Sequence, residues 1–316
     1  MAYLDRIARR KAEGSGQYLM ANGRIACLQQ SDPLRNFEFL SVMQLDAGRS
    51  EGKIFLAGAL DLSDISQLHG HRLCHEEEVA WNDRERTVRA RRLTRLAKLI
   101  LAEQPLAKPD PDLLAIALLD GIRQVGIGVL PWTDEARQLQ ARIVSLGQWR
   151  PDQGWPEVGD ARLADTLDEW LQPYLSKCRS LEQLGRLNLF EILQSLLPWH
   201  QQKLLDEGAP THLAVPSGSR LRLSYAPGGP PTLAVRLQEM FGLAETPKVC
   251  WGMVPCLVHL LSPARRPIQI TQDLQGFWNN TYHQVKTELQ GRYPKHSWPE
   301  NPWEAAPTAR IKRRRE

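Results

Sequence analysis

Several features of membrane proteins and secreted proteins are absent from this 316-residue sequence. No run of about 18 apolar residues occurs, so the sequence predicts no transmembrane helix. Residues 1–10 contain no apolar stretch of the kind found in signal peptides. The five cysteines are scattered and odd in number, which argues against a disulfide framework and favours a reducing compartment. We therefore expect a cytoplasmic protein that has no membrane partner.

Motifs that bind ATP or catalyse hydrolysis are also missing. The sequence has no G-x-x-x-x-G-K-[ST] loop to cradle phosphates and no D-E-x-H motif to hold magnesium. It has no G-x-S-x-G elbow to carry a nucleophilic serine. We therefore expect no catalytic residues, no cofactor and no ATP turnover from this chain alone.

Periodicity and turn signals predict an α+β protein with four parts. Residues 1–105 alternate short apolar runs with turn signals such as Asn22-Gly23, which is typical of a small OB-like β-barrel. Residues 106–208 follow a proline-rich boundary and predict a helical domain. Residues 209–292 mix strands and helices in a C-terminal α/β domain. Residues 293–316 form a Pro/Trp/Arg-rich tail, which we expect to be irregular and to lie on a surface or be partly disordered.

Basic residues are concentrated in two stretches, although the formal net charge is only +4. One stretch covers residues 84–98, and the other covers residues 310–315. If the first is a strand, side-chain alternation places Arg89, Arg91 and Arg95 on one face of the barrel. Guanidinium groups on a barrel face match the groove in which OB-folds hold single-stranded nucleic acid. A solvated charged surface is the alternative interpretation of both stretches.

The predicted nucleic-acid contacts extend beyond that face. The full set is Arg89, Arg91, Arg92, Arg95, Lys98, Arg220 and Lys295. Arg220 follows a turn, Ser217-Gly218-Ser219, that either contacts phosphate or is a plain hairpin loop. Lys295 lies in an aromatic and basic run whose tryptophans, Trp298 and Trp303, we expect to pin the tail. The aromatic residues of the first domain either stack on bases or form its core; they are Tyr18, Phe37, Phe39 and Trp81.

A histidine and cysteine cluster raises the question of a metal site. Its members are His69, His71, Cys74 and His75, and each residue type ligates zinc. Structural zinc sites usually combine two ligand pairs from separate segments, and no second pair is visible. We therefore predict no metal site, and a metal-dependent enzyme is the weakest hypothesis.

Longer runs carry a family resemblance. They are residues 2–10 (AYLDRIARR), 16–23 (GQYLMANG), 31–34 (SDPL), 88–92 (VRARR), 209–210 (AP), 215–220 (VPSGSR), 234–247 (AVRLQEMFGLAETP), 259–264 (HLLSPA) and 291–296 (GRYPKH). Together these runs resemble the HrpB-type ATP-dependent helicases, a bacterial branch of the DEAH-box RNA helicase-like proteins. The resemblance spans nearly the whole chain.

The resemblance implies a C-terminal portion of such a helicase, made of an OB-like domain and a family-specific region. ATP and magnesium would then be bound by RecA-like motor domains that this chain lacks, as in a truncated or split reading frame. The expected partners are single-stranded nucleic acid, RNA in this family, and the motor domains in cis or in trans. The alternative function is a protein-interaction scaffold that docks on a separate motor or ribonucleoprotein partner.

Overall fold

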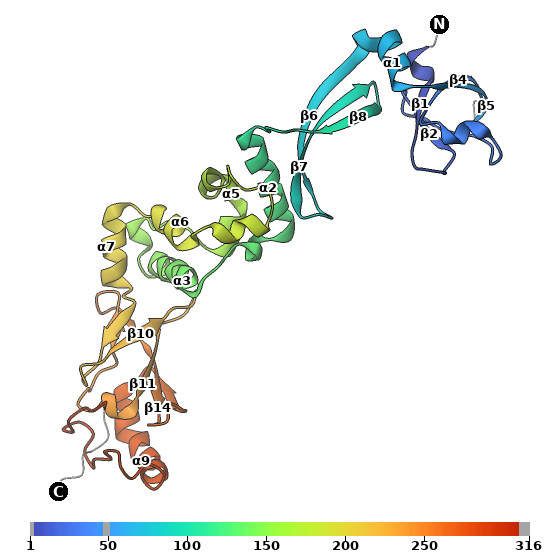
Figure 1. The fold of residues 1–316 in the computed structure, drawn as a ribbon. Coiled ribbons are helices and arrows are strands. Elements are labelled where there is room, and N and C mark those ends of the chain that lie inside the picture. Colours follow the sequence, from blue (N-terminus) through green and yellow to red (C-terminus); the bar gives the residue numbers. More distant parts are fainter. Residues whose placement is uncertain (1–2, 47–50, 310–316) are drawn as a thin grey trace. The chain divides into compact units, whose positions relative to one another are not determined.

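The computed structural model describes residues 3–46 and 51–309. The chain forms two compact units, shown in Figure 1. Unit 1 comprises Met1–Gln124 and Tyr174–Gln183, and unit 2 comprises Val125–Pro173 and Leu184–Glu316. The division into four domains remains a prediction. No helix in the described ranges is long and apolar enough to cross a membrane.

Unit 1 begins with a closed five-stranded barrel, which confirms the predicted N-terminal barrel. Its strands are β1 (Ile7–Arg10), β2 (Gln17–Met20), β3 (Ile25–Cys27), β4 (Phe39–Leu45) and β5 (Glu51–Leu60), in the order β1-β2-β3-β5-β4. The sheet closes because β1 pairs with β2 on one side and with β4 on the other. Gly23 adopts a φ of 89°, which permits the tight turn between β2 and β3.

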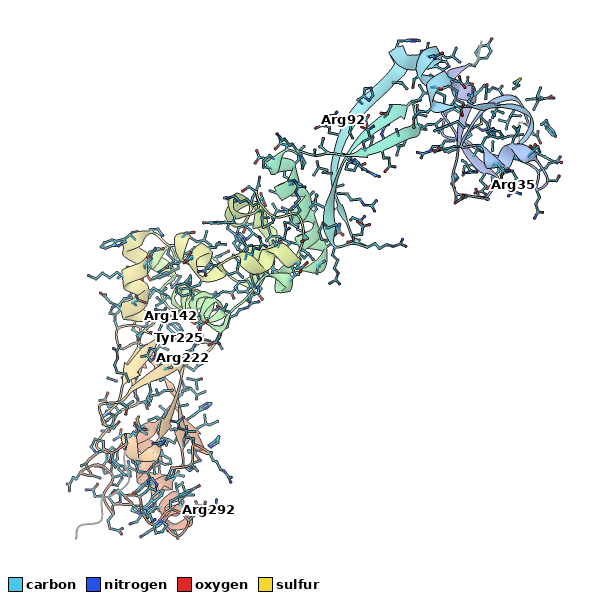
Figure 2. All side chains as sticks on the ribbon, in the orientation of Figure 1. Arg35, Arg92, Arg142, Arg222, Tyr225 and Arg292 are labelled. Carbon is cyan, nitrogen blue, oxygen red and sulfur yellow. The ribbon has the colours of Figure 1, made fainter. Side chains whose placement is uncertain are left out.

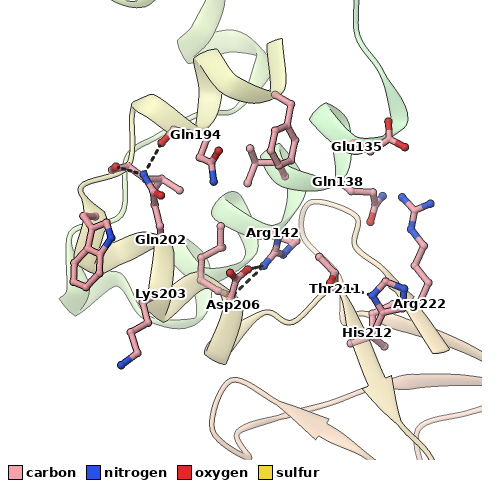
Figure 3. Close-up of a pocket in the computed structure, with 16 residues that line it drawn as sticks. Glu135, Gln138, Arg142, Gln194, Gln202, Lys203, Asp206, Thr211, His212 and Arg222 are labelled. Atoms are coloured by element: carbon pink, nitrogen blue, oxygen red, sulfur yellow. Dashed lines mark hydrogen bonds and ion pairs between the residues drawn. The ribbon is translucent and has the colours of Figure 1, made fainter. Parts of the chain in front are cut away.

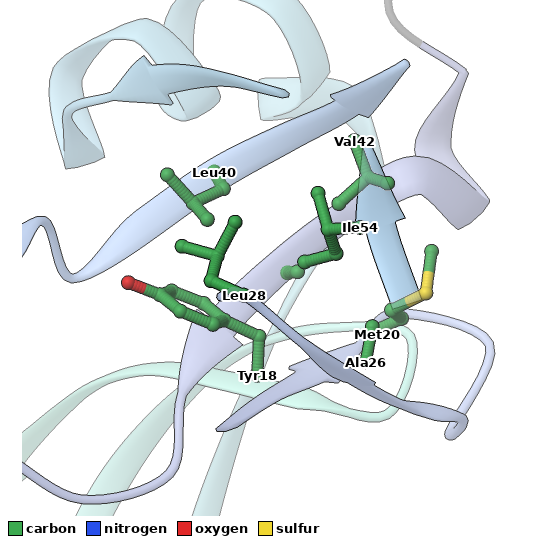
Figure 4. Close-up of a cluster of buried hydrophobic side chains, with 8 residues drawn as sticks. Tyr18, Met20, Ala26, Leu28, Leu40, Val42 and Ile54 are labelled. Carbon is green, nitrogen blue, oxygen red and sulfur yellow. The ribbon is translucent and has the colours of Figure 1, made fainter. Parts of the chain in front are cut away.

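Alternating apolar side chains fill the barrel, as Figure 4 shows. The core comprises Ala8, Tyr18, Met20, Ala26, Leu28, Leu40, Val42 and Ile54. The Tyr18 hydroxyl donates to the carbonyl oxygens of Leu34 and Phe37, at 2.9 and 2.8 Å. Burial raises the pKa of Tyr18, so its hydroxyl stays a neutral donor in this core.

Helix α1 (Leu62–His69) leads out of the barrel, and Asp61 and Asp64 form a capping box at its start. A second apolar cluster joins the barrel, α1 and the strands that follow. Its buried members are Ile7, Ala21, Phe39, Ile65, Leu96, Leu99 and Leu101. The barrel therefore has a fixed contact with the next sheet of unit 1.

That next sheet, which we call the connector sheet, is a three-stranded antiparallel ribbon. It contains β6 (Leu73–Asn82), β7 (Thr87–Leu96) and β8 (Leu99–Pro105), in the order β6-β7-β8. The expectation that Arg89, Arg91 and Arg95 lie on a barrel face is therefore wrong. These arginines lie on β7, outside the barrel, because the barrel already closes with β4 and β5.

Helix α2 (Pro111–Val125) packs on the connector sheet through Trp81, whose indole lies against Gly121. Residues 174–183 return to the same sheet from later in the chain. The Val88 amide donates to the Arg179 carbonyl at 2.8 Å, and Thr87 bridges to Ser180. A segment distant in sequence thus completes unit 1.

The predicted helical region is confirmed. Its remaining helices, in unit 2, are α3 (Asp134–Trp149), α4 (Asp160–Asp165), α5 (Leu167–Trp170), α6 (Leu189–Ser195) and α7 (Trp199–Gly208). The Thr133 side chain caps α3 by accepting a hydrogen bond from the Ala136 amide. Prolines between the helices, such as Pro131 and Pro198, break the chain where the sequence predicts the helices to end.

The C-terminal part mixes strands and helices, as predicted. Its sheet contains β9 (His212–Ala214), β10 (Arg220–Ser224), β11 (Thr232–Arg236), β14 (Leu257–Leu261) and β15 (Pro267–Thr271), in the order β15-β14-β11-β10-β9. Strands β12 (Lys248–Val249) and β13 (Val254–Pro255) form a separate hairpin. A π-helical segment, Phe277–Thr281, lies between α8 (Leu274–Gly276) and α9 (Tyr282–Gln290).

The tail is irregular, as expected, and it is pinned to unit 2 as far as residue 309. The Trp298 Nε1 donates to the Tyr293 carbonyl at 2.9 Å, and the Tyr282 hydroxyl donates to the Pro299 carbonyl at 2.9 Å. The Trp303 ring contacts Trp278, with 6.4 Å between centroids. The tryptophans therefore hold the tail, as predicted. The basic cluster at residues 310–315 lies outside the described residues.

Candidate nucleic-acid interface

Each of the four predicted arginines on β7 faces a carboxylate. Arg89 lies 2.6 Å from Glu85, Arg92 lies 2.8 Å from Glu77, and Arg95 lies 2.8 Å from Glu76. Arg91 contacts two acids, Glu78 at 2.8 Å and Glu103 at 2.6 Å. Arg95 Nε forms an ion pair with Glu76, but the geometry of this contact does not meet that of a hydrogen bond.

Strand register produces this ladder. Glu77 and Glu78 on β6 are directly opposite Arg92 and Arg91 on β7, and opposite charges in facing positions attract. The hydrogen bond to Glu78 raises the pKa of Arg91 further. Figure 2 shows Arg92 on this sheet. Each of these guanidinium groups already binds a carboxylate, with which a phosphate must compete, so the ladder is a weaker phosphate site than the sequence predicts.

A second basic cluster lies beside the barrel, in a shallow groove of about 390 Å³. Arg9, Arg10 and Lys11, at the end of β1, line one side, and Lys98 lines the other. Glu103 is the acid in this lining. We call this site the barrel groove. It contains more positive than negative side chains, which favours an anion.

Local contacts position the cations of the barrel groove. The Arg9 Nη1 donates to the Ile100 carbonyl at 2.5 Å, and the Arg10 Nη1 donates to the Arg35 carbonyl at 2.7 Å. Lys98 lies in the turn between β7 and β8, and its amide donates to the Ala21 carbonyl at 3.2 Å. The aliphatic part of the Lys98 side chain packs over Gly23, where an added Cβ would come within 2.6 Å of Lys98 Cδ.

Lys11 and Lys98 differ from the arginine ladder because both are exposed and neither forms an ion pair within residues 3–46 and 51–309. Their charges are therefore available to a ligand. Of the predicted contacts in unit 1, the structure brings only Lys98 into this groove. The sequence-based set of nucleic-acid contacts did not include Arg9, Arg10 and Lys11, although three consecutive basic residues indicate a possible phosphate site.

The predicted aromatic residues are mainly structural. Tyr18 and Phe39 are buried in the core, and Trp81 packs on Gly121. Phe37 is the one of the four whose ring is exposed. Among these residues, Phe37 is therefore the most accessible to a base.

The remaining predicted contacts, Arg220 and Lys295, are both exposed in unit 2. Arg220 begins β10, while Lys295 follows α9 in the pinned tail. The Ser217 hydroxyl beside Arg220 donates to the buried carboxylate of Glu239 at 3.0 Å, which favours the hairpin-loop interpretation of that turn. His296 is partly buried, and this burial, together with the charge of Arg236, lowers its pKa.

The histidine and cysteine cluster does not assemble in the described part of the chain. Cys74 and His75 lie on β6, and the His75 ring contacts the Thr94 hydroxyl at 3.2 Å. No group of three histidine, cysteine or acidic side chains with metal-binding geometry occurs among the described residues.

Two family models match the chain, and the regions they match correspond to elements of the fold. The model described as "ATP-dependent helicase C-terminal" matches residues 170–302, and it defines the class of protein. The model described as "ATP-dependent RNA helicase HrpB, connector region" matches residues 72–106, which span the connector sheet. Together the two models cover more than half of the chain.

Proteins of similar sequence and structure belong to the same class. The ATP-dependent RNA helicase HrpB of Escherichia coli (strain K12) is 42% identical over 314 residues, covering 99% of this chain and 39% of the relative. The crystal structure of the E. coli DExH-box NTPase HrpB superposes with a TM-score of 0.64 at 42% identity, covering 98% of this chain and 38% of that one. A crystal structure of the Escherichia coli DEAH/RHA helicase HrpB superposes with a TM-score of 0.55 at 39% identity, covering 93% of this chain and 37% of that one.

The chain belongs to the HrpB-type ATP-dependent RNA helicases, of which it corresponds to the C-terminal portion. It spans about two fifths of the length of the relatives it matches. The resemblance carried by the sequence motifs is therefore confirmed.

Proposed function

We propose that this chain is a nucleic-acid-binding portion of an HrpB-type RNA helicase and holds a single strand while ATP is hydrolysed elsewhere. The barrel groove is the observation that carries the proposal. Lys11 and Lys98 have no ion-pair partner in the part of the chain that the structure describes, and they lie beside an OB-like barrel; such barrels track a strand by its phosphates. RNA is the expected ligand because the relatives are described as RNA helicases.

The other predicted contacts take secondary roles. Arg89, Arg91, Arg92 and Arg95 contribute where a phosphate displaces their carboxylates, and Arg220 and Lys295 add exposed charges in unit 2. ATP and magnesium belong to the motor domains, which act in cis in the family or in trans on this chain. The cytoplasm is the expected location because the cysteines are free.

The test is binding of a fluorescein-labelled oligouridylate across a salt series. We expect Lys11→Glu with Lys98→Glu to weaken binding roughly tenfold, or about 1.4 kcal/mol. The slope of log K against log salt should also fall by about 0.7 for each phosphate that the protein no longer neutralises. The matched control is Lys108→Glu with Lys177→Glu, because both are exposed lysines of unit 1 outside the groove and the net charge changes equally. Wild-type affinity in the double variant, or binding that ignores salt, contradicts the proposal.

An exposed apolar patch favours a second candidate function, which is docking on a protein partner. Met43 on β4 and Phe55 and Leu56 on β5 are each more than half exposed. Exposed apolar side chains on paired strands such as β4 and β5 can mark a protein interface. If docking on the motor domains is the main role, Phe55→Ser with Leu56→Ser abolishes pull-down of those domains and leaves RNA affinity unchanged.

A further inference from the structure

Unit 2 contains a pocket of about 690 Å³ where α3, α6 and α7 meet β9 and β10, as Figure 3 shows. The arginines and the lysine that line it each lie within 4.0 Å of a carboxylate. The pairs are Arg142 with Asp206, Arg222 with Asp134, and Lys203 with Glu207. This end of the five-stranded sheet of unit 2 therefore presents no excess of positive charge to a ligand.

The other end of the same sheet gathers arginines from separate strands. Because β10 and β11 are antiparallel, Arg220 at the start of β10 and Arg236 at the end of β11 lie at the same end. Strand β14 is parallel to β11, with Leu261 opposite Arg236. The turn of residues 262–266, which joins β14 to β15, therefore lies at this end as well. We call it the arginine end of the sheet.

Helix α9 returns the chain to the arginine end. Burial lowers the pKa of His296, and so does the charge of Arg236, so these two residues lie close together. Figure 2 shows Arg292, in the same segment, well away from Arg222. The segment that follows α9 therefore adds Arg292 and Lys295 to the arginines of the strands.

Positive charge exceeds negative charge at this end. The basic residues are Arg220, Arg236, Arg265, Arg266, Arg292 and Lys295, and none of them forms an ion pair within residues 3–46 and 51–309. Acidic residues on the segments that reach this end are Glu239, Glu288 and Glu304. Glu239 is only 5% exposed, and its carboxylate accepts a hydrogen bond from the Ser217 hydroxyl at 3.0 Å. The balance favours an anionic ligand.

The turn of residues 262–266 holds two of these arginines on a fixed backbone. Ser262 is 3% exposed, and its hydroxyl accepts a hydrogen bond from the Arg266 amide at 3.1 Å. The Arg265 amide donates to the Ser262 carbonyl at 2.8 Å, and Arg265 has a φ of 61°. This left-handed conformation is unfavourable for a residue with a side chain, whereas glycine adopts it freely. An exposed arginine kept at such a position points to a role for its side chain.

We propose that the arginine end is a second nucleic-acid surface, which binds the phosphates of a single-stranded RNA and does not read its bases. Arg265 and Arg266 contact phosphate oxygens, and the other exposed cations extend the surface. The rings of Tyr293 and Trp298 in the adjoining segment are half-buried and buried, so they do not offer an open face on which a base can stack. The proposal rests on the proposed function for its ligand class, but its residues lie in a different unit from the barrel groove.

The experiment measures binding of the full chain to a fluorescein-labelled oligouridylate and to an abasic oligomer of the same length, across a salt series. We expect Arg265→Glu with Arg266→Glu to weaken binding of both oligomers by about tenfold or more, because charged hydrogen bonds are lost. The slope of log K against log salt should fall by about 0.7 for each phosphate that is no longer neutralised.

The matched control is Arg162→Glu with Arg186→Glu, which changes the net charge equally at exposed arginines in the helical region of unit 2. Its affinity should match that of the wild type. A loss of affinity for the oligouridylate alone would show base recognition and overturn the proposal. Wild-type affinity of the Arg265→Glu, Arg266→Glu protein for both oligomers overturns it as well.

Arg265→Gly separates the role of this arginine in binding from any role in the fold. Because glycine adopts the left-handed conformation freely, the thermal unfolding temperature of this variant should not fall. Its RNA affinity and its salt slope should both decrease, because one guanidinium group is lost. Stability that falls while RNA affinity stays at the wild-type value would show that Arg265 is structural, and would contradict the proposal.

The two RNA sites are separated by combining variants. If Arg265→Glu with Arg266→Glu weakens binding in the Lys11→Glu, Lys98→Glu protein as well as in the wild type, the arginine end is supported even where the barrel groove fails. If the Lys11→Glu, Lys98→Glu protein loses affinity and the Arg265→Glu, Arg266→Glu protein does not, the arginine end is overturned and the barrel groove stands.

Discussion

At the scale of single residues, close contacts decide which side chains the fold tolerates. Gly121 on α2 is an example, because Trp81 of the connector sheet lies directly on its Cα. A Cβ at this position would meet Trp81 Cδ2 at a separation closer than real side chains adopt. Glycine is otherwise unfavourable inside a helix, so here the lower helix propensity is offset by the contact with the indole.

We expect Gly121→Ala to lower the free energy of unfolding by about 1–3 kcal/mol, because the added methyl group overpacks the site. Gly147→Ala on α3 is the matched control. Its Cβ would meet Trp155 Cβ at 3.5 Å, an ordinary contact, so alanine there should be neutral or stabilising by up to about 1 kcal/mol. Urea unfolding followed by circular dichroism measures both. Equal effects of the two substitutions would refute the steric explanation.

At the scale of elements, the connector sheet carries a ladder of opposed charges. Most side chains of its strands β6 and β7 are exposed or half-buried, and the opposed Glu and Arg residues form ion pairs across the strands. Exposed pairs of this kind each contribute only about 0–1 kcal/mol to stability. Their larger effect is on binding, because each carboxylate competes with phosphate for the same guanidinium group.

We therefore expect Glu77→Gln with Glu78→Gln to strengthen RNA binding, because Arg92 loses its carboxylate partner and Arg91 keeps only Glu103. The slope of log K against log salt should steepen by about 0.7 for each additional phosphate that is neutralised. Glu157→Gln with Glu191→Gln changes the net charge equally, at exposed acids outside the ladder, and should leave the slope unchanged. If both double variants behave alike, net charge and not the ladder controls binding.

At the scale of the whole molecule, each unit has a core with its own buried tyrosine. The Tyr18 hydroxyl bonds to two carbonyls in the barrel, and the Tyr225 hydroxyl donates to the Pro210 carbonyl at 2.7 Å in unit 2. Burial raises the pKa of both phenols. Removing either hydroxyl leaves a buried acceptor unsatisfied, at a cost of about 1–3 kcal/mol.

Calorimetry of the full chain should therefore show more than one transition. Tyr18→Phe should lower the transition temperature of unit 1 alone, and Tyr225→Phe should lower that of unit 2 alone. A single transition that both substitutions shift by the same amount would show instead that the two units unfold cooperatively.

Much of the architecture was predictable because its signals are local. Asn22-Gly23 marks a hairpin of the barrel, Thr133 marks the start of α3, and apolar alternation marks the buried faces. The long runs of motif residues were enough to indicate the family. These features depend on neighbours within a few residues, or on whole-chain similarity, so the sequence determined them by itself.

The tertiary structure alone decided which charges are available to a ligand. Arg91 and Lys98 look alike as members of one basic stretch, yet Arg91 is held by Glu78 and Glu103 while Lys98 reaches the barrel groove. The difference depends on strand register and on how the turn between β7 and β8 packs on the barrel. A pocket of about 690 Å³ in unit 2 likewise joins side chains from α3, α7 and β10. Such contacts are set by long-range packing, which short-range sequence patterns do not encode.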